Sequence, residues 1–342
     1  MNLQSLYNQA VQLHQRGNLI EAGLLYQQIL GAQPDNFAVL HLLGIVRAQQ
    51  GDNESALQLI GAAIKINPGV ADFHCNCGNV LKALGRHLEA LASYDRAIAA
   101  DPRSADAFNN RGIVLRDLKR FDEALASYDR ALAAKPDNFE AWNNRGNILL
   151  NLKRYTEALA SYDRAAAIRP NGAETYSNRG DALHRLNRPA EALASYDRAL
   201  AVRPGLASTL NNRGLALMDL RHFEEALASY ERALAVNPNN PEAWNNRGNA
   251  LRLLGRLEQA LASYERAIAL QPDYAEALNN RGLTLTATKR FKEAEASHEQ
   301  ALRLNPDFVD APPMDHRAAR QEREFLEEAL VSYDDSLEIG GS

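Results

Sequence analysis

Long apolar segments are missing from this sequence of 342 residues. No stretch approaches the roughly 20 apolar residues that a membrane-spanning helix needs. The first residues contain several Gln and Asn where the core of a signal peptide would be apolar. We therefore expect a soluble, cytoplasmic protein that does not interact with a membrane.

An excess of positive charge is missing as well. The 43 acidic and 38 basic side chains leave a formal net charge of -5. This balance gives no general attraction for the phosphate backbone of DNA or RNA. We therefore expect no nucleic-acid partner.

The residue patterns of enzymes and metal sites are also absent. The two cysteines, Cys75 and Cys77, would point to different sides of a helix, so they indicate neither a disulfide nor a zinc site. The eight histidines are scattered, and no phosphate-binding loop, dinucleotide motif or nucleophile elbow occurs. We expect no catalytic residues, no cofactor, no bound metal and no enzymatic activity.

What the sequence does contain is an internal repeat marked by proline. The spacing between successive members of this proline series is 34 residues throughout. The prolines are Pro34, Pro68, Pro102, Pro136, Pro170, Pro204, Pro238, Pro272 and Pro306. If each proline is position 32 of its repeat, nine repeats span 3–36, 37–70, 71–104, 105–138, 139–172, 173–206, 207–240, 241–274 and 275–308.

Each repeat has the apolar spacing of two amphipathic helices. In the fifth repeat, Trp142, Gly146 and Leu149 follow one helical face, and a second face begins at Tyr155. Small residues recur at positions 8, 20 and 27, where larger side chains would hold paired helices apart. The pattern predicts an all-α array of helix-turn-helix repeats.

Trp, Gly, Tyr, Ala, Tyr or Phe, Ala and Pro at positions 4, 8, 11, 20, 24, 27 and 32 resemble the tetratricopeptide repeat, although position 11 is Leu in most repeats. The resemblance covers about residues 3–308. It implies a right-handed superhelical solenoid in which the first helix of each repeat lines a concave groove. It also implies that positions 2, 5, 6, 9, 12 and 13 face that groove.

The repeat pattern stops after Pro306. Residues 309–314 are a proline-rich break, and residues 315–338 contain a segment similar to a second helix of the repeats. We expect 315–338 to form a helix that caps the last repeat, because a terminal repeat otherwise exposes its apolar face. Residues 339–342 are expected to be a disordered tail.

Asparagines dominate the predicted groove. An Asn side chain offers N–H donors beside a carbonyl acceptor, so a row of them could hold the main chain of an extended peptide. The proposed peptide-binding residues are Asn76, Asn110, Asn144, Asn178, Asn212, Asn246 and Asn280 at position 6, Asn143 and Asn245 at position 5, and Asn147 and Asn249 at position 9.

The asparagines at position 6 resemble those of the tetratricopeptide superhelix of O-linked N-acetylglucosamine transferase, where they hold peptide main chain. The leading interpretation is a protein-interaction scaffold that binds an extended peptide or partner protein in the groove. An alternative is the recognition arm of a larger, glycosyltransferase-like enzyme, whose catalytic domain this chain does not contain. The plainer alternative for the asparagines is that they only keep the groove hydrated.

Two sets of charged residues also recur. Acids at position 2, such as Asp106 and Glu140, could favour a basic ligand or could simply stabilise the first turn of each helix. Arginine at position 7 appears in repeats that carry an acid at position 25, as with Arg145 and Asp163. We expect each such arginine to pair, partly buried, with the acid of its own repeat.

Overall fold

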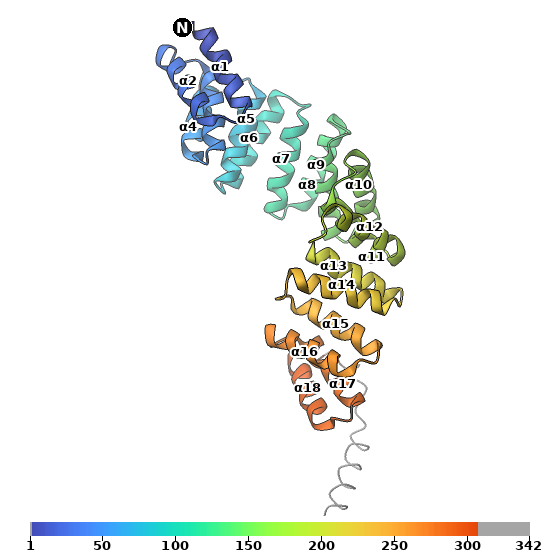
Figure 1. Ribbon diagram of the computed structural model, residues 1–342. Helices are drawn as coiled ribbons and strands as arrows, with labels where there is room; N and C mark the ends of the chain where they lie inside the picture. Colours follow the sequence, from blue (N-terminus) through green and yellow to red (C-terminus); the bar gives the residue numbers. More distant parts are fainter. Residues whose placement is uncertain (1, 307–342) are drawn as a thin grey trace, which may run out of the picture. The chain divides into compact units, whose positions relative to one another are not determined.

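The computed structural model describes residues 2–306, and every regular element within them is an α-helix (Figure 1). The first helices of the repeats are α1 (Leu3–Gln15), α3 (Phe37–Gln49), α5 (Ala71–Ala83), α7 (Ala105–Asp117), α9 (Phe139–Asn151), α11 (Ala173–Arg185), α13 (Ala207–Asp219), α15 (Pro241–Leu253) and α17 (Ala275–Ala287). The second helices are α2 (Leu19–Ala32), α4 (Asn53–Ile66), α6 (His87–Ala100), α8 (Phe121–Ala134), α10 (Tyr155–Ile168), α12 (Pro189–Val202), α14 (Phe223–Val236), α16 (Leu257–Leu270) and α18 (Phe291–Leu304). The predicted all-α solenoid of paired helices is confirmed for these residues.

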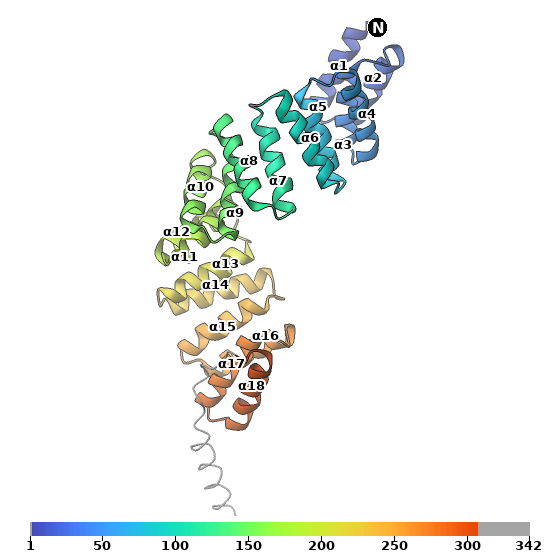
Figure 2. The ribbon, with the colours of Figure 1, turned by 180° about the vertical axis from the view of Figure 1, so that it is seen from behind.

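The predicted break at 309–314, the capping helix at 315–338 and the tail at 339–342 lie outside the described residues. The chain divides into two compact parts, the first ending at Ala182 and the second beginning at Leu183. Figures 1 and 2 show that, in each part, the helices follow one another in chain order.

The turn between the two helices of a repeat requires one residue in the left-handed backbone region. Glycine occupies this position where φ is +80° at Gly17 and +86° at Gly51. Other repeats place Lys119, Lys153 or Arg221 there, with φ close to +60°. Glycine adopts this conformation without steric cost, whereas the other residues do so only because the packed helices on both sides impose the turn.

In most repeats the two helices pack through a glycine and a large side chain. A Cβ atom added to Gly146 would lie 2.6 Å from Cε1 of Tyr162, and the Tyr162 side chain is fully buried. The same contact joins Gly112 with Tyr128. In the second repeat Ile60 takes the place of the tyrosine. The absence of a side chain at position 8 therefore lets the second helix place a bulky group against the first.

The first helices line the inner side of each part. Among them, α3 contacts α5, α5 contacts α7 and α7 contacts α9, and in the second part α13 contacts α15 and α15 contacts α17. No two second helices in the described residues make comparable contact. Elements whose successive copies lie closest form the inner side of a bend. The side chains of Asn144 and Asn178 lie between such neighbours, because each bonds to the preceding first helix.

The glycine contact predicts a large difference between two Gly→Ala substitutions. Gly146→Ala should lower the free energy of unfolding by about 1–3 kcal/mol, because the new methyl group would clash with the buried Tyr162 ring. Gly61→Ala on α4 is the control, since nothing lies within 4 Å of its added Cβ. It should raise stability by up to about 1 kcal/mol. Urea denaturation followed by circular dichroism measures both, and similar effects of the two changes would contradict the packing account.

Candidate functional site

The asparagines at position 6 are tied to the preceding repeat. The amide nitrogen of Asn178 donates to Oδ1 of Asn147 at 2.9 Å, and that of Asn144 donates to Oδ1 of Asn109 at 3.3 Å. The other bonds of this kind are Asn76 to Nε2 of His41 (2.9 Å), Asn110 to Asn79 (3.0 Å), Asn246 to Asn211 (3.1 Å) and Asn280 to Asn245 (3.0 Å). Each bond fixes the orientation of one carboxamide on the inner side.

One of these bonds requires a neutral histidine. The nitrogen of the Asn76 amide can only donate, so Nε2 of His41 must accept. Burial lowers the pKa of His41, which favours the neutral ring.

Part of the carboxamide remains available at three of these positions. An Asn side chain has two N–H donors and an oxygen with two lone pairs. The bond to the preceding repeat uses one N–H. Within residues 2–306, the oxygens of Asn144, Asn178 and Asn280 accept no hydrogen bond, and these side chains are half-buried. Asn212 is also half-buried on α13, whereas Asn246 is only 7% exposed.

The predicted residues at position 5 are mostly internal. Asn245 is fully buried, donates to Oε1 of Glu276 at 3.0 Å and accepts the bond from Asn280. The prediction that Asn245 binds a peptide is therefore corrected, because both the nitrogen and the oxygen of its amide are used inside the protein. Asn143 is half-buried, and its oxygen accepts a bond from Oγ1 of Thr175 at 3.1 Å.

The asparagines at position 9 bind buried tyrosines. The hydroxyl groups of Tyr162 and Tyr264 donate to the side-chain oxygens of Asn147 (2.8 Å) and Asn249 (2.9 Å). Burial raises the pKa of both tyrosines, so the hydroxyls stay protonated and donate. The Asn147 oxygen accepts from both Tyr162 and Asn178, so it has no capacity left for a ligand.

Sequence reasoning missed this role of position 9, although a signal was present. Tyrosine at position 24 is nearly constant, while position 9 is Asn, Asp or an aliphatic residue. Where position 9 is Ile113 or Leu215, the hydroxyls of Tyr128 and Tyr230 are buried without a partner among the described residues. Position 9 therefore decides whether the buried hydroxyl is satisfied.

The predicted pairing of Arg145 with Asp163 is wrong. Arg145 binds Asp129 of the preceding repeat at 2.8 Å, and Asp163 accepts from Arg179 of the following repeat at 2.7 Å. The other pairs of this kind are Arg111 with Asp95, Arg213 with Asp197, and Arg247 with Glu231. These bridges join successive repeats, which explains why the third repeat has Asp95 without an arginine of its own.

A serine at position 23 binds the arginine in most of these bridges, and sequence reasoning also missed it. The second arm of the Arg145 guanidinium donates to Oγ of Ser161 at 2.8 Å, and Ser161 donates to the Glu157 carbonyl at 2.9 Å. Repeats one and two carry Leu25 and Leu59 at this position and have no arginine at position 7. The serine and the arginine therefore belong to one polar network.

Neither a metal site nor a membrane span is found in the described part of the chain. Residues 2–306 contain no group of three or more His, Cys, Asp or Glu side chains placed to hold a metal ion. No helix among them is both long and apolar enough to cross a bilayer.

Comparison with protein families assigns the repeat. A model described as a tetratricopeptide repeat matches residues 7–71, 41–105, 75–138, 109–173, 211–272 and 254–307. A second model with the same description matches residues 173–239. No curated protein matches the chain.

Several solved structures resemble the chain. YrrB, described as a TPR protein with an unusual peptide-binding site, is 25% identical, with a TM-score of 0.50 over 54% of this chain and 95% of its own. PilW, a type IV pilus biogenesis factor, is 27% identical, with a TM-score of 0.54 over 60% and 96%. The C-terminal part of a TPR repeat-containing protein from Cytophaga hutchinsonii is 17% identical, with a TM-score of 0.58 over 70% and 98%, and shows the fold alone.

The two environments of the buried tyrosines predict opposite effects of one substitution. Tyr162→Phe should destabilise the protein by about 1 kcal/mol, because it removes the bond to Asn147. Tyr128→Phe should be neutral or stabilising, because the hydroxyl it removes has no partner. Thermal denaturation of both variants measures the difference. Equal losses of stability would show that the hydroxyl bond to position 9 has no energetic role.

Proposed function

Since the chain belongs to the tetratricopeptide-repeat family, whose members are generally protein-interaction scaffolds, we propose that it binds an extended polypeptide along its first helices. The proposed contacts are made by the first-part amide row, defined as Asn110, Asn144 and Asn178. Asn280 is proposed to act in the same way in the second part.

The observation that carries this proposal is the fixed orientation of half-buried amides. Asn144 and Asn178 each use one N–H to bind the preceding repeat. The side chain is therefore ordered before a ligand arrives, which reduces the entropy that binding must offset. The second N–H and the oxygen remain, and together they match the C=O and N–H of one peptide unit.

A main-chain contact of this kind tolerates many ligand sequences. Each neutral hydrogen bond contributes only about 0.5–1.5 kcal/mol net, so several amides must act together to hold a peptide. The 34-residue period presents one amide at position 6 in each repeat from the third onward. Repetition rather than any single residue then supplies the affinity.

The comparison with YrrB supports a peptide ligand, since that protein has a peptide-binding site on a similar array of repeats. The glycosyltransferase-arm alternative gains no support from the family models or from the similar structures described above. We propose a binding function without a cofactor or a catalytic step. Cytoplasmic location stays a prediction from composition.

The amide row predicts a graded loss of binding. Asn144→Ala alone should weaken binding of a selected peptide by roughly tenfold at most, because one hydrogen-bonded pair is lost. The triple change Asn110→Ala, Asn144→Ala and Asn178→Ala should abolish it. Isothermal titration calorimetry with peptides selected from a random library on the immobilised protein measures both effects.

The control is the double change Asp122→Ala and Thr156→Ala, at exposed positions of the second helices α8 and α10. It should leave peptide affinity unchanged. Circular dichroism checks that each variant is still folded. Undiminished affinity in a folded triple variant would exclude the amide row as the binding element.

A further inference from the structure

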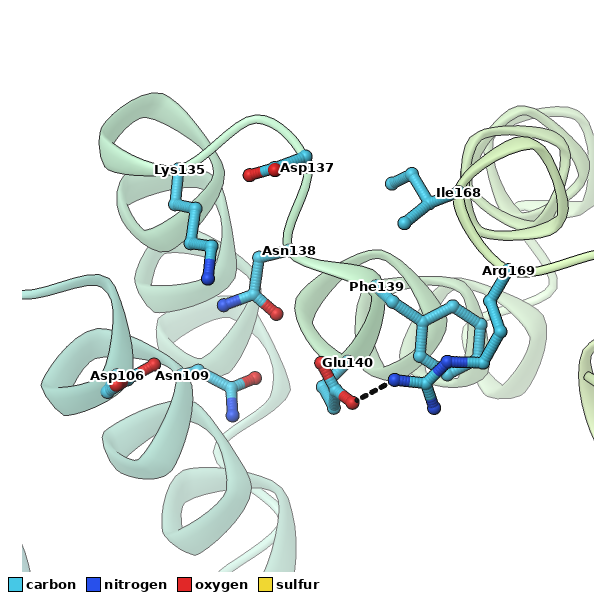
Figure 3. A pocket seen from close by; sticks show the side chains of 9 residues that line it. All are labelled: Asp106, Asn109, Lys135, Asp137, Asn138, Phe139, Glu140, Ile168 and Arg169. Atoms are coloured by element: carbon cyan, nitrogen blue, oxygen red, sulfur yellow. Dashed lines mark hydrogen bonds and ion pairs between the residues drawn. The ribbon is translucent and has the colours of Figure 1, made fainter.

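A pocket of about 340 Å³ lies beside the amide row in the first part (Figure 3). Asp106 and Asn109 of α7 form one side, and Lys135, at the end of α8, and Asn138, before α9, form another. Phe139 and Ile168 supply an apolar wall. Asn109 also accepts the bond from Asn144, so the pocket adjoins the proposed peptide path.

The pocket is open because Arg169 binds the carboxylate of Glu140 and keeps it away from Asn109. In the second part, Glu242 accepts from the amide of Asn211 at 3.3 Å and Glu276 accepts from Asn245 at 3.0 Å. At the matching place, Glu140 instead binds Arg169 at 2.8 Å. The Arg169 guanidinium lies 3.8 Å from the centre of the Phe139 ring, which keeps it in place (Figure 3). Asn109 is thereby left without the glutamate that fills the corresponding space elsewhere.

The lining presents donors and acceptors together. Asn109 and Asn138 are 8% and 7% exposed, so both are more than nine-tenths buried. Asn138 accepts from the backbone N–H of Ala141 at 3.0 Å, while its amide nitrogen has no partner within residues 2–306 and points into the pocket (Figure 3). The ammonium group of Lys135 adds a second donor, and the carboxylate of Asp106 adds an acceptor; neither forms an ion pair in the described residues.

The arrangement of charge decides which ligand group fits. A cationic side chain would meet Lys135, and an anionic one would meet Asp106 and Asp137. A carboxamide avoids both conflicts, because its oxygen can accept from Lys135 and Asn138 while its N–H groups donate to Asp106. Sites built to hydrogen-bond a polar group reject analogues that lack it, because their buried groups are then left unpaired.

We propose that this pocket is a specificity subsite for a glutamine or asparagine side chain of the bound polypeptide. The inference rests on the proposed peptide-binding function and adds a residue preference to it. The main-chain contacts of the amide row are independent of ligand sequence, so the pocket would supply the selection that the row lacks.

The test uses a library of random 12-residue peptides presented to the full chain. Retained peptides should be enriched in Gln or Asn at one position. Replacement of that residue by Glu, Lys or Met should weaken binding about tenfold. Retained peptides with no preference, or with a preference for charge, would overturn the subsite and leave the proposed function intact. Retention of no peptide at all would overturn the proposed function and the subsite with it.

Two variants test why the pocket is open. Arg169→Leu frees Glu140 to turn toward Asn109 and fill the space, so the amide preference should be lost while peptides are still retained. Adding Glu140→Ala to Arg169→Leu removes the filling group, so the preference should return. Circular dichroism confirms that both variants fold. If the double variant, still folded, does not recover the preference, the pocket is not the source of the selection.

Discussion

The contact between a glycine of the first helix and a large side chain of the second is the constraint on which the rest of the structure depends. A ring such as that of Tyr162 can be fully buried against the backbone only because Gly146 has no side chain. This contact sets how closely the two helices lie. It also carries the tyrosine hydroxyl to the inner side, where position 9 either binds it or leaves it unsatisfied.

Hydrogen bonds and ion pairs between polar side chains join one repeat to the next. The Asn147 oxygen accepts both from its own Tyr162 and from Asn178 of the following repeat, so the buried ring is linked to the inner surface. On another face, Arg179 binds Asp163 across the same boundary. The asparagines that connect repeats are therefore the same side chains that we propose to hold a ligand.

The sequence predicted the helices and their period, because proline, glycine and the apolar spacing act within one repeat. The sequence could not show which acid Arg145 binds. Asp163 of its own repeat and Asp129 of the preceding repeat fit the repeat pattern equally well. A strict period gives both acids the same position number, and only packing shows that the arginine turns back to the preceding repeat. Asn245 presents a similar case, because its amide donates to Glu276 of the next repeat, a partner that the pattern within one repeat does not show.

The most direct measurement of the central claim is a crystal structure of the chain with a peptide selected by binding. The account predicts that the main-chain N–H and C=O groups of the peptide lie within about 2.7–3.2 Å of the amides of Asn144 and Asn178. A peptide bound to the second helices, or held only through its side chains, would contradict the account.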